Sequence, residues 1–319
     1  MRIIAKVLAA AALAAAAAPT WAQDYPVREI RSICNFAAGS GADIIVRYYS
    51  DKLSRLAGKP VIVENKPGAQ GLLATDYVAK SKPDGYTILI TPASSTLATA
   101  PHIFKQIPFD PLKDFQPVTT INSLPFVVAV DAAKPYRTLA EFIAALRAKE
   151  GHGFYGTQSN TGQVSAELLK AHTGLKTAYV PFKITGDAFT ALLGGNIDFM
   201  SVDATWASTQ QQKVRILAVT SAKRSGSLPD VPTMMELGYK DFDITAWWGV
   251  VVPAGTPRPI VDRLAAWTNQ ITNSDETKTF LSRAALDAFP GSPEQMAALL
   301  KVDTERWANY VRMAKIEPQ

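Results

Sequence analysis

The residues of this chain that could do chemistry are glycines, hydroxyl-bearing residues and aspartates in loops between an expected strand and the next helix. Residues 36–43 (FAAGSGAD) and 182–187 (FKITGD) are two such loops. The N-terminus of a helix offers unpaired N–H groups and the positive end of the helix dipole, which suit a carboxylate or phosphate. Glycine lets these N–H groups approach a ligand closely. The chemistry indicated is binding of a small anion by neutral donors.

The candidate ligand-binding residues all lie at the end of an expected strand or near the start of the following helix. They are Phe36, Gly39, Ser40, Gly41, Ala42, Asp43, Thr91, Ser94, Ser95, Ser159, Thr161, Phe182, Thr185, Gly186, Asp187 and Asp203. In open α/β sheets, ligands bind at the carboxyl ends of the strands. Hydrogen bonds from neutral donors, at about 0.5–1.5 kcal/mol each, could sum to the roughly −8 kcal/mol of a micromolar ligand.

The three aspartates of this set have two interpretations each. For Asp43, the role of a helix N-cap is favoured over contact with a ligand. Asp187 and Asp203 could bind a ligand ammonium or cap helices, and capping is favoured for Asp187.

Catalysis and metal binding are not expected. Cys34 is the only thiol and lies in an expected buried strand, which favours a packing role. Neither a G-x-S-x-G elbow nor a glycine-rich nucleotide motif occurs. His102, His152 and His172 share no metal-ligand spacing, and the last two are expected at the surface. We therefore expect no metal, no cofactor and no enzyme; catalysis by the loop hydroxyls is the remaining alternative.

The N-terminal segment indicates export. Residues 1–6 contain two basic residues, residues 7–18 form an Ala-rich apolar run, and Thr20 and Ala22 are small residues typical of a cleavage site. We expect residues 1–22 to be a signal peptide. A membrane anchor is the alternative, but the apolar run is too short to span a bilayer comfortably. Cleavage would leave 319 − 22 = 297 residues.

The charge of the chain does not indicate nucleic-acid binding. There are 33 basic and 28 acidic residues, for a net charge of +5. Without Arg2 and Lys6 the count is 31 against 28, or +3. Because the basic residues are interleaved with acids and form no stripe with aromatic residues, no nucleic-acid partner is expected.

Strand-like and helix-like patterns alternate along the chain, which predicts parallel sheet in an α/β fold. Strands expected at 29–36, 61–64 and 86–91 alternate with helices at 45–56 and 72–82. A second α/β unit begins with a strand at 126–130 and contains a helix opened by Thr138. The last segment has a strand at 247–252, a helix that starts at Thr256-Pro257 and a helix that starts at Ser292.

That last segment has too few strands for a sheet of its own, so we expect it to rejoin the first unit. The expected domains are residues 23–124 with 246–319 as lobe 1, and residues 125–245 as lobe 2. The chain would cross between the lobes near 121–126 and 243–249. Two crossings with a cleft between the lobes are typical of binding proteins that close about a hinge.

Several motifs, in order, make the chain resemble the periplasmic solute-binding proteins of tripartite tricarboxylate transporters, the TctC-like or Bug family. They are 25–26 (YP), the strand and glycine loop at 30–43, 61–69 (VIVENKPGA), 83–87 (PDGYT), 109–115 (FDPLKDF), 179–183 (YVPFK), 192–198 (LLGGNID), 217–225 (LAVTSAKRS), 228–233 (LPDVPT) and 253–257 (PAGTP). The resemblance implies a two-lobed, type II-like periplasmic binding protein fold with mixed or parallel sheets flanked by helices. It also implies that backbone N–H groups, hydroxyls and bridging waters hold the carboxylate, without a dedicated arginine.

The chain departs from the family pattern in the loops that the resemblance assigns to the ligand. The family usually has PFPPGG where this chain has NFAAGS at 35–40, and Tyr-Lys-Gly where this chain has FKI at 182–184. The segment after Asp203 is shorter and carries Trp206. These changes suggest a less polar and roomier site, which an aromatic or longer-chain carboxylate would need.

The partners implied by the resemblance are a small carboxylate and the permease subunits of a tripartite transporter. A monomer in the periplasm is expected. The alternative is a sensory protein that presents its ligand to a membrane signalling partner.

Overall fold

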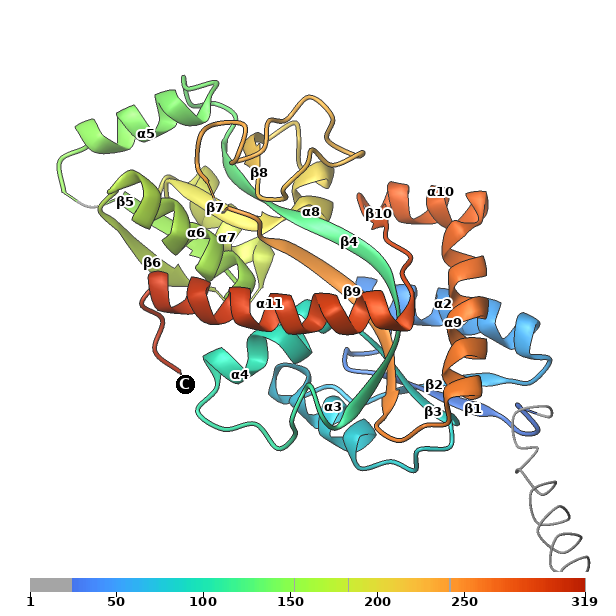
Figure 1. Ribbon diagram of the computed structural model, residues 1–319. Coiled ribbons are helices and arrows are strands. Elements are labelled where there is room, and N and C mark those ends of the chain that lie inside the picture. The colour runs from blue at the N-terminus through green and yellow to red at the C-terminus, as the bar shows by residue number, and fades with distance from the viewer. Residues whose placement is uncertain (1–24, 152, 183, 241, 319) are drawn as a thin grey trace, which may run out of the picture.

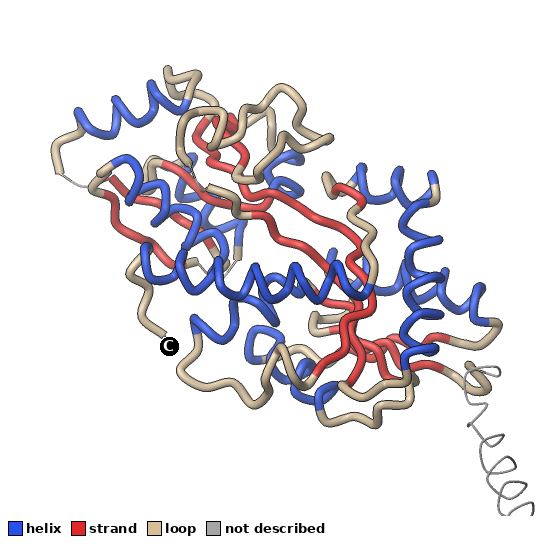
Figure 2. Tube along the Cα trace, viewed as in Figure 1, coloured by secondary structure: helices blue, strands red, loops and turns tan. Residues whose placement is uncertain are grey.

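The computed structural model describes residues 25–151, 153–182, 184–240 and 242–318. The expected signal peptide at 1–22 and His152 lie outside the described residues. The fold is mixed α/β, with a curled sheet flanked by helices, as predicted (Figures 1 and 2). Within the described residues, no helix is both long and apolar enough to cross a membrane.

The strands alternate with helices along most of the chain. They are β1 (Ile30–Cys34), β2 (Val61–Asn65), β3 (Thr87–Thr91), β4 (Phe115–Asp131), β5 (Gly153–Thr157), β6 (Thr177–Pro181), β7 (Phe199–Asp203), β8 (Val214–Val219), β9 (Thr245–Pro253) and β10 (Asp287–Ala288). β3 (TILIT) is buried along its whole length. A continuous apolar run of this kind is typical of a strand covered on both faces.

The strands form two groups that share β4. In the first group the order is β2-β1-β3-β9-β4, with β10 paired to β4. Here β1 is parallel to β2 and β3, whereas β9 is antiparallel to β3 and β4. In the second group the order is β4-β7-β5-β6, with β8 also paired to β4. There β5 is parallel to β6 and β7, and both β7 and β8 are antiparallel to β4.

β4 is much longer than the strand expected at 126–130. Its pairing with β9 extends as far as Pro125, and its pairing with β7 begins at Phe126. The chain has prolines at 117 and 125, and proline normally interrupts a strand because it cannot donate a hydrogen bond to a neighbouring strand. Pro117 lies instead beside a shift in register, and Pro125 lies where the strand changes partners.

The helices cover the faces of the sheet (Figure 2). They are α2 (Gly41–Ala57), α3 (Leu72–Ala79), α4 (Ala100–Ile103), α5 (Leu139–Ala148), α6 (Asn160–Thr173), α7 (Thr185–Leu193), α8 (Ala204–Thr209), α9 (Arg258–Asn273), α10 (Asp275–Arg283) and α11 (Pro293–Met313), with two short irregular helices, η1 (Ala69–Gly71) and η2 (Ser94–Thr99). α9 begins one residue later than expected, since Pro257 and not Thr256 is its N-cap. α10 was not expected from the sequence.

The last helix, α11, lies across both strand groups (Figure 1). It contacts η2, β4 and α6. Ser292 opens it, as expected, and forms a capping box in which Ser292 and Gln295 bond each other's backbone N–H groups. Its Trp307 is 1% exposed and belongs to the apolar core. α11 therefore joins the C-terminal part of the chain to both groups of strands.

Candidate ligand-binding site

The carboxyl ends of the parallel strands in both groups point toward the place where β4 changes partners. Thr91, the last residue of β3, lies opposite Gly249 of β9. Asp203, the last residue of β7, lies opposite Phe126 of β4. Because β1 is parallel to β3, and β5 and β6 run parallel with β7, all five strands end toward the same place. We call this place, where β4 passes from β9 to β7 between Pro125 and Phe126, the crossing. Every sequence-predicted site residue lies at one of these ends or in the segment that follows it.

The loop after β1 is held by its own polar groups. Ser40 is the N-cap of α2, and its Oγ accepts a 3.2 Å hydrogen bond from the N–H of Asp43. Gly39 has a φ of 80°, a left-handed conformation that favours glycine. Its N–H donates to Asp43 Oδ2 at 2.8 Å. The N–H groups of Gly41 and Ala42, in the first turn of α2, are not needed by the helix and remain available for an anion.

Asp43 is a buried support of this loop, and the expectation that it is the N-cap is wrong. Its carboxylate accepts hydrogen bonds from Arg47 Nε at 2.8 Å and from Asn65 Nδ2 at 2.7 Å, besides that from Gly39. Burial alone would raise the pKa of Asp43, but the hydrogen bonds from Arg47, Asn65 and Gly39 outweigh burial and lower the pKa to about 2. The buried, charged carboxylate of Asp43 therefore stabilises the conformation of this loop.

An aromatic pair lies beside the same loop. The rings of Phe36 and Trp248 are stacked, with centroids 5.6 Å apart and planes at 20°. Trp248 is 6% exposed. Since Trp248 belongs to β9, this pair connects the loop after β1 to the crossing strand.

The residues at the end of β3 are mostly engaged with neighbours. Thr91 Oγ1 lies 3.3 Å from Asn35 Oδ1 and 3.1 Å from Thr96 Oγ1. Ser94 Oγ accepts a 3.1 Å hydrogen bond from the N–H of Trp247. Ser95 is half-buried. These hydroxyls and the Asn35 amide make a polar layer beside β9.

In the second group of strands, the loop after β5 leads tightly into α6. Ser159 is the N-cap, and its Oγ accepts from the N–H of Gly162 at 3.1 Å. Thr161 is buried, at 6% exposure. A Cβ on Gly162 would overlap Thr157 Oγ1 and the backbone oxygen of Ser201, so glycine is needed for α6 to lie this close to β7.

The loop after β6 is more open. Ile184 is the N-cap of α7 and makes no side-chain capping bond, so the expectation that Asp187 caps this helix is wrong. Asp187 lies in the first turn and is exposed, Thr185 is half-buried, and Gly186 is exposed with open space around its Cα. Phe182 is half-buried and packs against the apolar cluster of α7 and β7. Among the described residues, no hydrogen bond or ion pair joins this loop to the loop at 36–43.

Asp203 is an N-cap. Its Oδ1 accepts a 2.8 Å hydrogen bond from the N–H of Trp206 at the start of α8. Burial raises the pKa of the Asp203 carboxyl, and the hydrogen bond from Trp206 offsets only part of this rise. The indole of Trp206 meets the ring of Phe189 edge to face, with centroids 5.2 Å apart.

Sequence reasoning missed the supports of these loops. Arg47 and Asn65 hold Asp43, and the tandem Trp247 and Trp248 flank the ends of β1 and β3. Thr220, fully buried, accepts from the N–H of Phe126 at 2.9 Å and so ties β8 to β4 where the pairing changes. The pair of tryptophans in an otherwise aliphatic strand was the one visible signal in the sequence.

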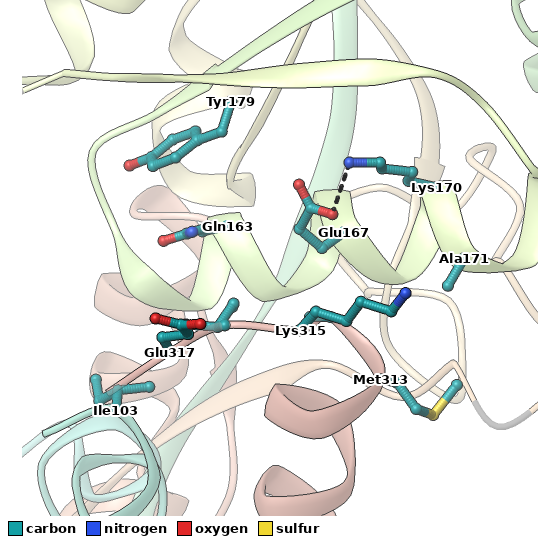
Figure 3. Close-up of a pocket in the computed structure, with 11 residues that line it drawn as sticks. Ile103, Gln163, Glu167, Lys170, Ala171, Tyr179, Met313, Lys315 and Glu317 are labelled. Atoms are coloured by element: carbon teal, nitrogen blue, oxygen red, sulfur yellow. Dashed lines mark ion pairs between the residues drawn. The ribbon is translucent and has the colours of Figure 1, made fainter. Parts of the chain in front are cut away.

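A cavity of about 650 Å³ lies between α6, the end of α4 and the segment after α11 (Figure 3). None of the sequence-predicted site residues lines it. Within the described ranges, no three His, Cys, Asp or Glu side chains cluster as a metal site.

The chain is similar over nearly its whole length to a known family. A sequence profile described as "Tripartite tricarboxylate transporter family receptor" matches residues 45–316. The protein BugT of Bordetella pertussis is 32% identical over 305 residues, which are 94% of this chain and 94% of BugT.

Solved structures show the same fold at similar identity. Rpa4515 of R. palustris, solved with adipate, has a TM-score of 0.80 and 30% identity, covering 93% of this chain and 100% of that chain. MatC (Rpa3494) from Rhodopseudomonas palustris, solved with bound malate, has a TM-score of 0.74 and 28% identity, covering 90% of this chain and 100% of that chain.

Proposed function

Because the chain belongs to the family of tripartite tricarboxylate transporter receptors, we propose that it binds a small organic carboxylate and delivers it to the permease subunits of a tripartite transporter. The family is one of periplasmic solute-binding receptors, not of enzymes. The ligand would bind between lobe 1 (residues 23–124 and 246–319) and lobe 2 (residues 125–245). This division is supported by the change of partners along β4 between Pro125 and Phe126.

The observation that carries the proposal is that five strands end at the crossing, where β4 changes partners. Two helix starts there have backbone donors that the helices do not use, at Gly41 and Ala42 and at Thr185 and Gly186. Hydroxyls of Ser40 and Thr185 can add to these donors. Such groups fit an anion without a dedicated cation, because the anion also interacts favourably with the positive end of each helix dipole. The negative charge of Asp43 is already compensated by Arg47.

The ligand that we propose is an aromatic or longer-chain carboxylate. The similar structures were solved with adipate and with malate, so we compare the expected ligand with these two small dicarboxylates. In this chain the half-buried Phe36, stacked on the buried Trp248, lies in the first loop, and the half-buried Phe182 lies at the second. An apolar ligand body between two carboxylate-binding loops would bury against these rings, at about 25 cal/mol per Å² of apolar area.

The test is a ligand panel measured by thermal shift and isothermal titration calorimetry. Malate, adipate, terephthalate, phthalate and benzoate span short, long and aromatic acids, with the matching amides as neutral controls. We expect adipate or an aromatic diacid to bind more tightly than malate, and the amides not to bind. Stabilisation by malate alone would contradict the ligand class, and no response to any carboxylate would contradict the function.

A pair of substitutions distinguishes a site effect from loss of fold. Phe36→Leu removes one ring of the Phe36–Trp248 stack. Phe280→Leu removes one ring of the Tyr48–Phe280 stack, neither residue of which is a candidate ligand-binding residue. Both variants should lower the unfolding temperature. Only Phe36→Leu should weaken binding of the ligand found in the panel. Equal affinities for the two variants would place the ligand elsewhere.

Location and delivery have separate tests. We propose that residues 1–22 direct export to the periplasm, so the N-terminus of the mature protein should be Gln23. We also propose that the protein acts as a monomer, which size-exclusion chromatography with light scattering would verify. A deletion strain should lose uptake of the ligand identified above. Normal uptake with a lost transcriptional response would indicate a sensory role instead.

A further inference from the structure

The cavity of Figure 3 is built from three separate parts of the chain. Its lining includes Gln163, Glu167 and Lys170 of α6, Tyr179 of β6, and the segment from Met313 to Glu317. Its volume of about 650 Å³ is within the usual 300–1,000 Å³ or so of small-molecule pockets. The three α6 residues are spaced by four and three positions, so they share one face of the helix.

The wall formed by the C-terminal segment has an unusual backbone. α11 ends in a turn in which Lys315 has a φ of 51°, and Ile316 N–H donates to the oxygen of Val311 at 3.1 Å. This position after a helix normally selects glycine, because a side chain there is sterically strained. Ile316 packs against the apolar core, while Lys315 and Glu317, on either side of it, line the cavity. The turn thus holds two opposite charges at the cavity.

On the opposite wall, Glu167 and Tyr179 are held in place by the buried Tyr155. Tyr155, which is fully buried, donates a 2.7 Å hydrogen bond to Glu167 Oε1, and its ring stacks on that of Tyr179 with centroids 5.3 Å apart. Glu167 Oε2 pairs with Lys170 Nζ at 3.2 Å. Tyr179 itself donates to the backbone oxygen of Thr157 at 3.3 Å, which leaves its oxygen free to accept. Glu167 is therefore held in place and directs Lys170.

The charges on α6, Glu167 and Lys170, pair with each other, whereas, in the part of the chain that the structure describes, the two charges on the C-terminal wall do not form an ion pair. Neither Lys315 nor Glu317 has an ion-pair partner among the described residues. In Figure 3 the carboxylate of Glu317 lies at the Gln163 end of the cavity, and the ammonium of Lys315 points toward Ala171, at the Lys170 end. One end therefore offers a carboxylate, an amide and a phenol oxygen. The other end offers the ammonium group of Lys315 and that of Lys170, which is paired with Glu167.

From this arrangement we infer that the cavity is a second binding site, for a small zwitterion of the amino-acid or ω-amino-acid type. The ammonium of the ligand would lie against Glu317, Gln163 and Tyr179. Its carboxylate would lie against Lys315 and Lys170. Glu167 and Lys170 already pair with each other, so the unpaired charges among the described residues of the lining are those of Glu317 and Lys315. A ligand with only one charge would pair with one of these two and leave the other unpaired. None of the sequence-predicted site residues lines this cavity, and the inference does not depend on the function proposed for the strand ends.

The test uses 4-aminobutyrate with butyrate and butylammonium as matched probes that each lack one charge. Binding to the full mature chain is followed by amide chemical shifts in ¹⁵N–¹H NMR spectra, a readout that suits the weak affinity of partly exposed ion pairs. We expect 4-aminobutyrate to shift the signals of residues 163–171 and 313–317. Butyrate and butylammonium should shift them at least about threefold less at equal concentration.

Substitutions at Lys315 separate binding from folding. Lys315→Gly removes the ammonium and also relieves the strained backbone, so it should raise stability while it weakens 4-aminobutyrate binding by about threefold or more. Lys301→Met, on an exposed position of α11, is the charge control and should leave binding unchanged. The inference would be overturned by shifts confined to the loops at 36–43 and 182–187, by equal shifts from butyrate, by unaltered binding to Lys315→Gly, or by no shifts at all.

Discussion

The carboxylate of Asp303 on α11 accepts a 2.8 Å hydrogen bond from the indole N–H of Trp247 on β9. Both side chains are buried, at 3% and 2% exposure. Asp303 Oδ2 also accepts from the indole of Trp307 at 3.3 Å, and Asp303 Oδ1 lies 3.6 Å from Arg306. Arg306 in turn pairs with Asp243 at 2.9 Å, just before β9. One face of α11 therefore holds the segment in which the chain returns from the second group of strands to the first.

Replacing Asp303 should destabilise the protein strongly. Asp303→Leu leaves two buried indole N–H groups without an acceptor, at about 1–3 kcal/mol for each orphaned donor. The measurement is the free energy of unfolding from urea titration. Asp51→Leu, on an exposed face of α2, should change that free energy by less than about 0.5 kcal/mol. Similar losses in the two variants would show that the bond between α11 and β9 contributes little.

Ser40 and Ser292 both cap helices, but only Ser40 lies in a candidate ligand loop. Ser40→Ala and Ser292→Ala should each lower the free energy of unfolding by about 0.5–2 kcal/mol, because each removes one capping bond. Only Ser40→Ala should also weaken carboxylate binding, as measured by calorimetry. If both variants bound the ligand as tightly as the unaltered protein, the loop at 36–43 would not be part of the site.

Two glycines near helix starts should respond in opposite ways to alanine. Gly162→Ala places a methyl group on Thr157 and on the backbone of Ser201, and should destabilise the fold by about 1–3 kcal/mol. Gly186→Ala meets open space in the first turn of α7 and should stabilise the fold by about 0.4–1 kcal/mol. The new methyl group of Gly186→Ala should nevertheless weaken carboxylate binding. Thermal unfolding and calorimetry separate the two effects, and unaltered affinity would remove Gly186 from the site.

Asp43 should make stability depend on pH in acid. Its pKa is about 2 in the folded chain and 3.8 without these contacts, so the unfolded chain takes up the proton first as pH falls. The contribution of Asp43 is complete above its unfolded pKa and is lost as pH falls from about 4 to 2. The difference in unfolding free energy between the unaltered protein and Asp43→Asn should therefore shrink over this range. For Asp51→Asn, on an exposed face of α2, the difference should be small. A constant difference for Asp43→Asn would show that its carboxylate is not ionised as described.

Much of the fold follows from local sequence patterns. The alternating strands and helices of the first hundred residues, the helix starts at Thr138 and Ser292 and the glycine loops after strands could all be predicted, because period, caps and turns are set by neighbouring residues. β4 was predicted too short, because Pro117 and Pro125 mark a break for a strand considered alone. In the structure Pro117 lies beside a shift in register with β9, and Pro125 lies where β4 changes from β9 to β7. At both places the regular hydrogen-bond pattern is interrupted, so the missing N–H groups are tolerated.

For the candidate site, the residue types were predictable and their roles were not. Asp43 was expected to cap α2, and Asp187 to cap α7. The structure gives the first role to Ser40, and the second to Ile184, which makes no side-chain capping bond. Asp43 bonds Asn65, which is 22 positions away in the chain and therefore invisible to any local pattern. Trp247 and Trp248 acquire their contacts with Asp303 and Phe36 only when β9 lies beside β3.

The sequence by itself determined the family, the α/β class and the kind of chemistry: neutral donors at helix starts, with a single cysteine and few histidines. These properties depend on composition and on residues close together in the chain. Only the tertiary structure decided which donors remain unused, how β4 passes from one group of strands to the other, and that α11 and its C-terminal turn meet α6. Such facts depend on contacts between distant segments, whose free energy is set by packing and burial that no local pattern contains.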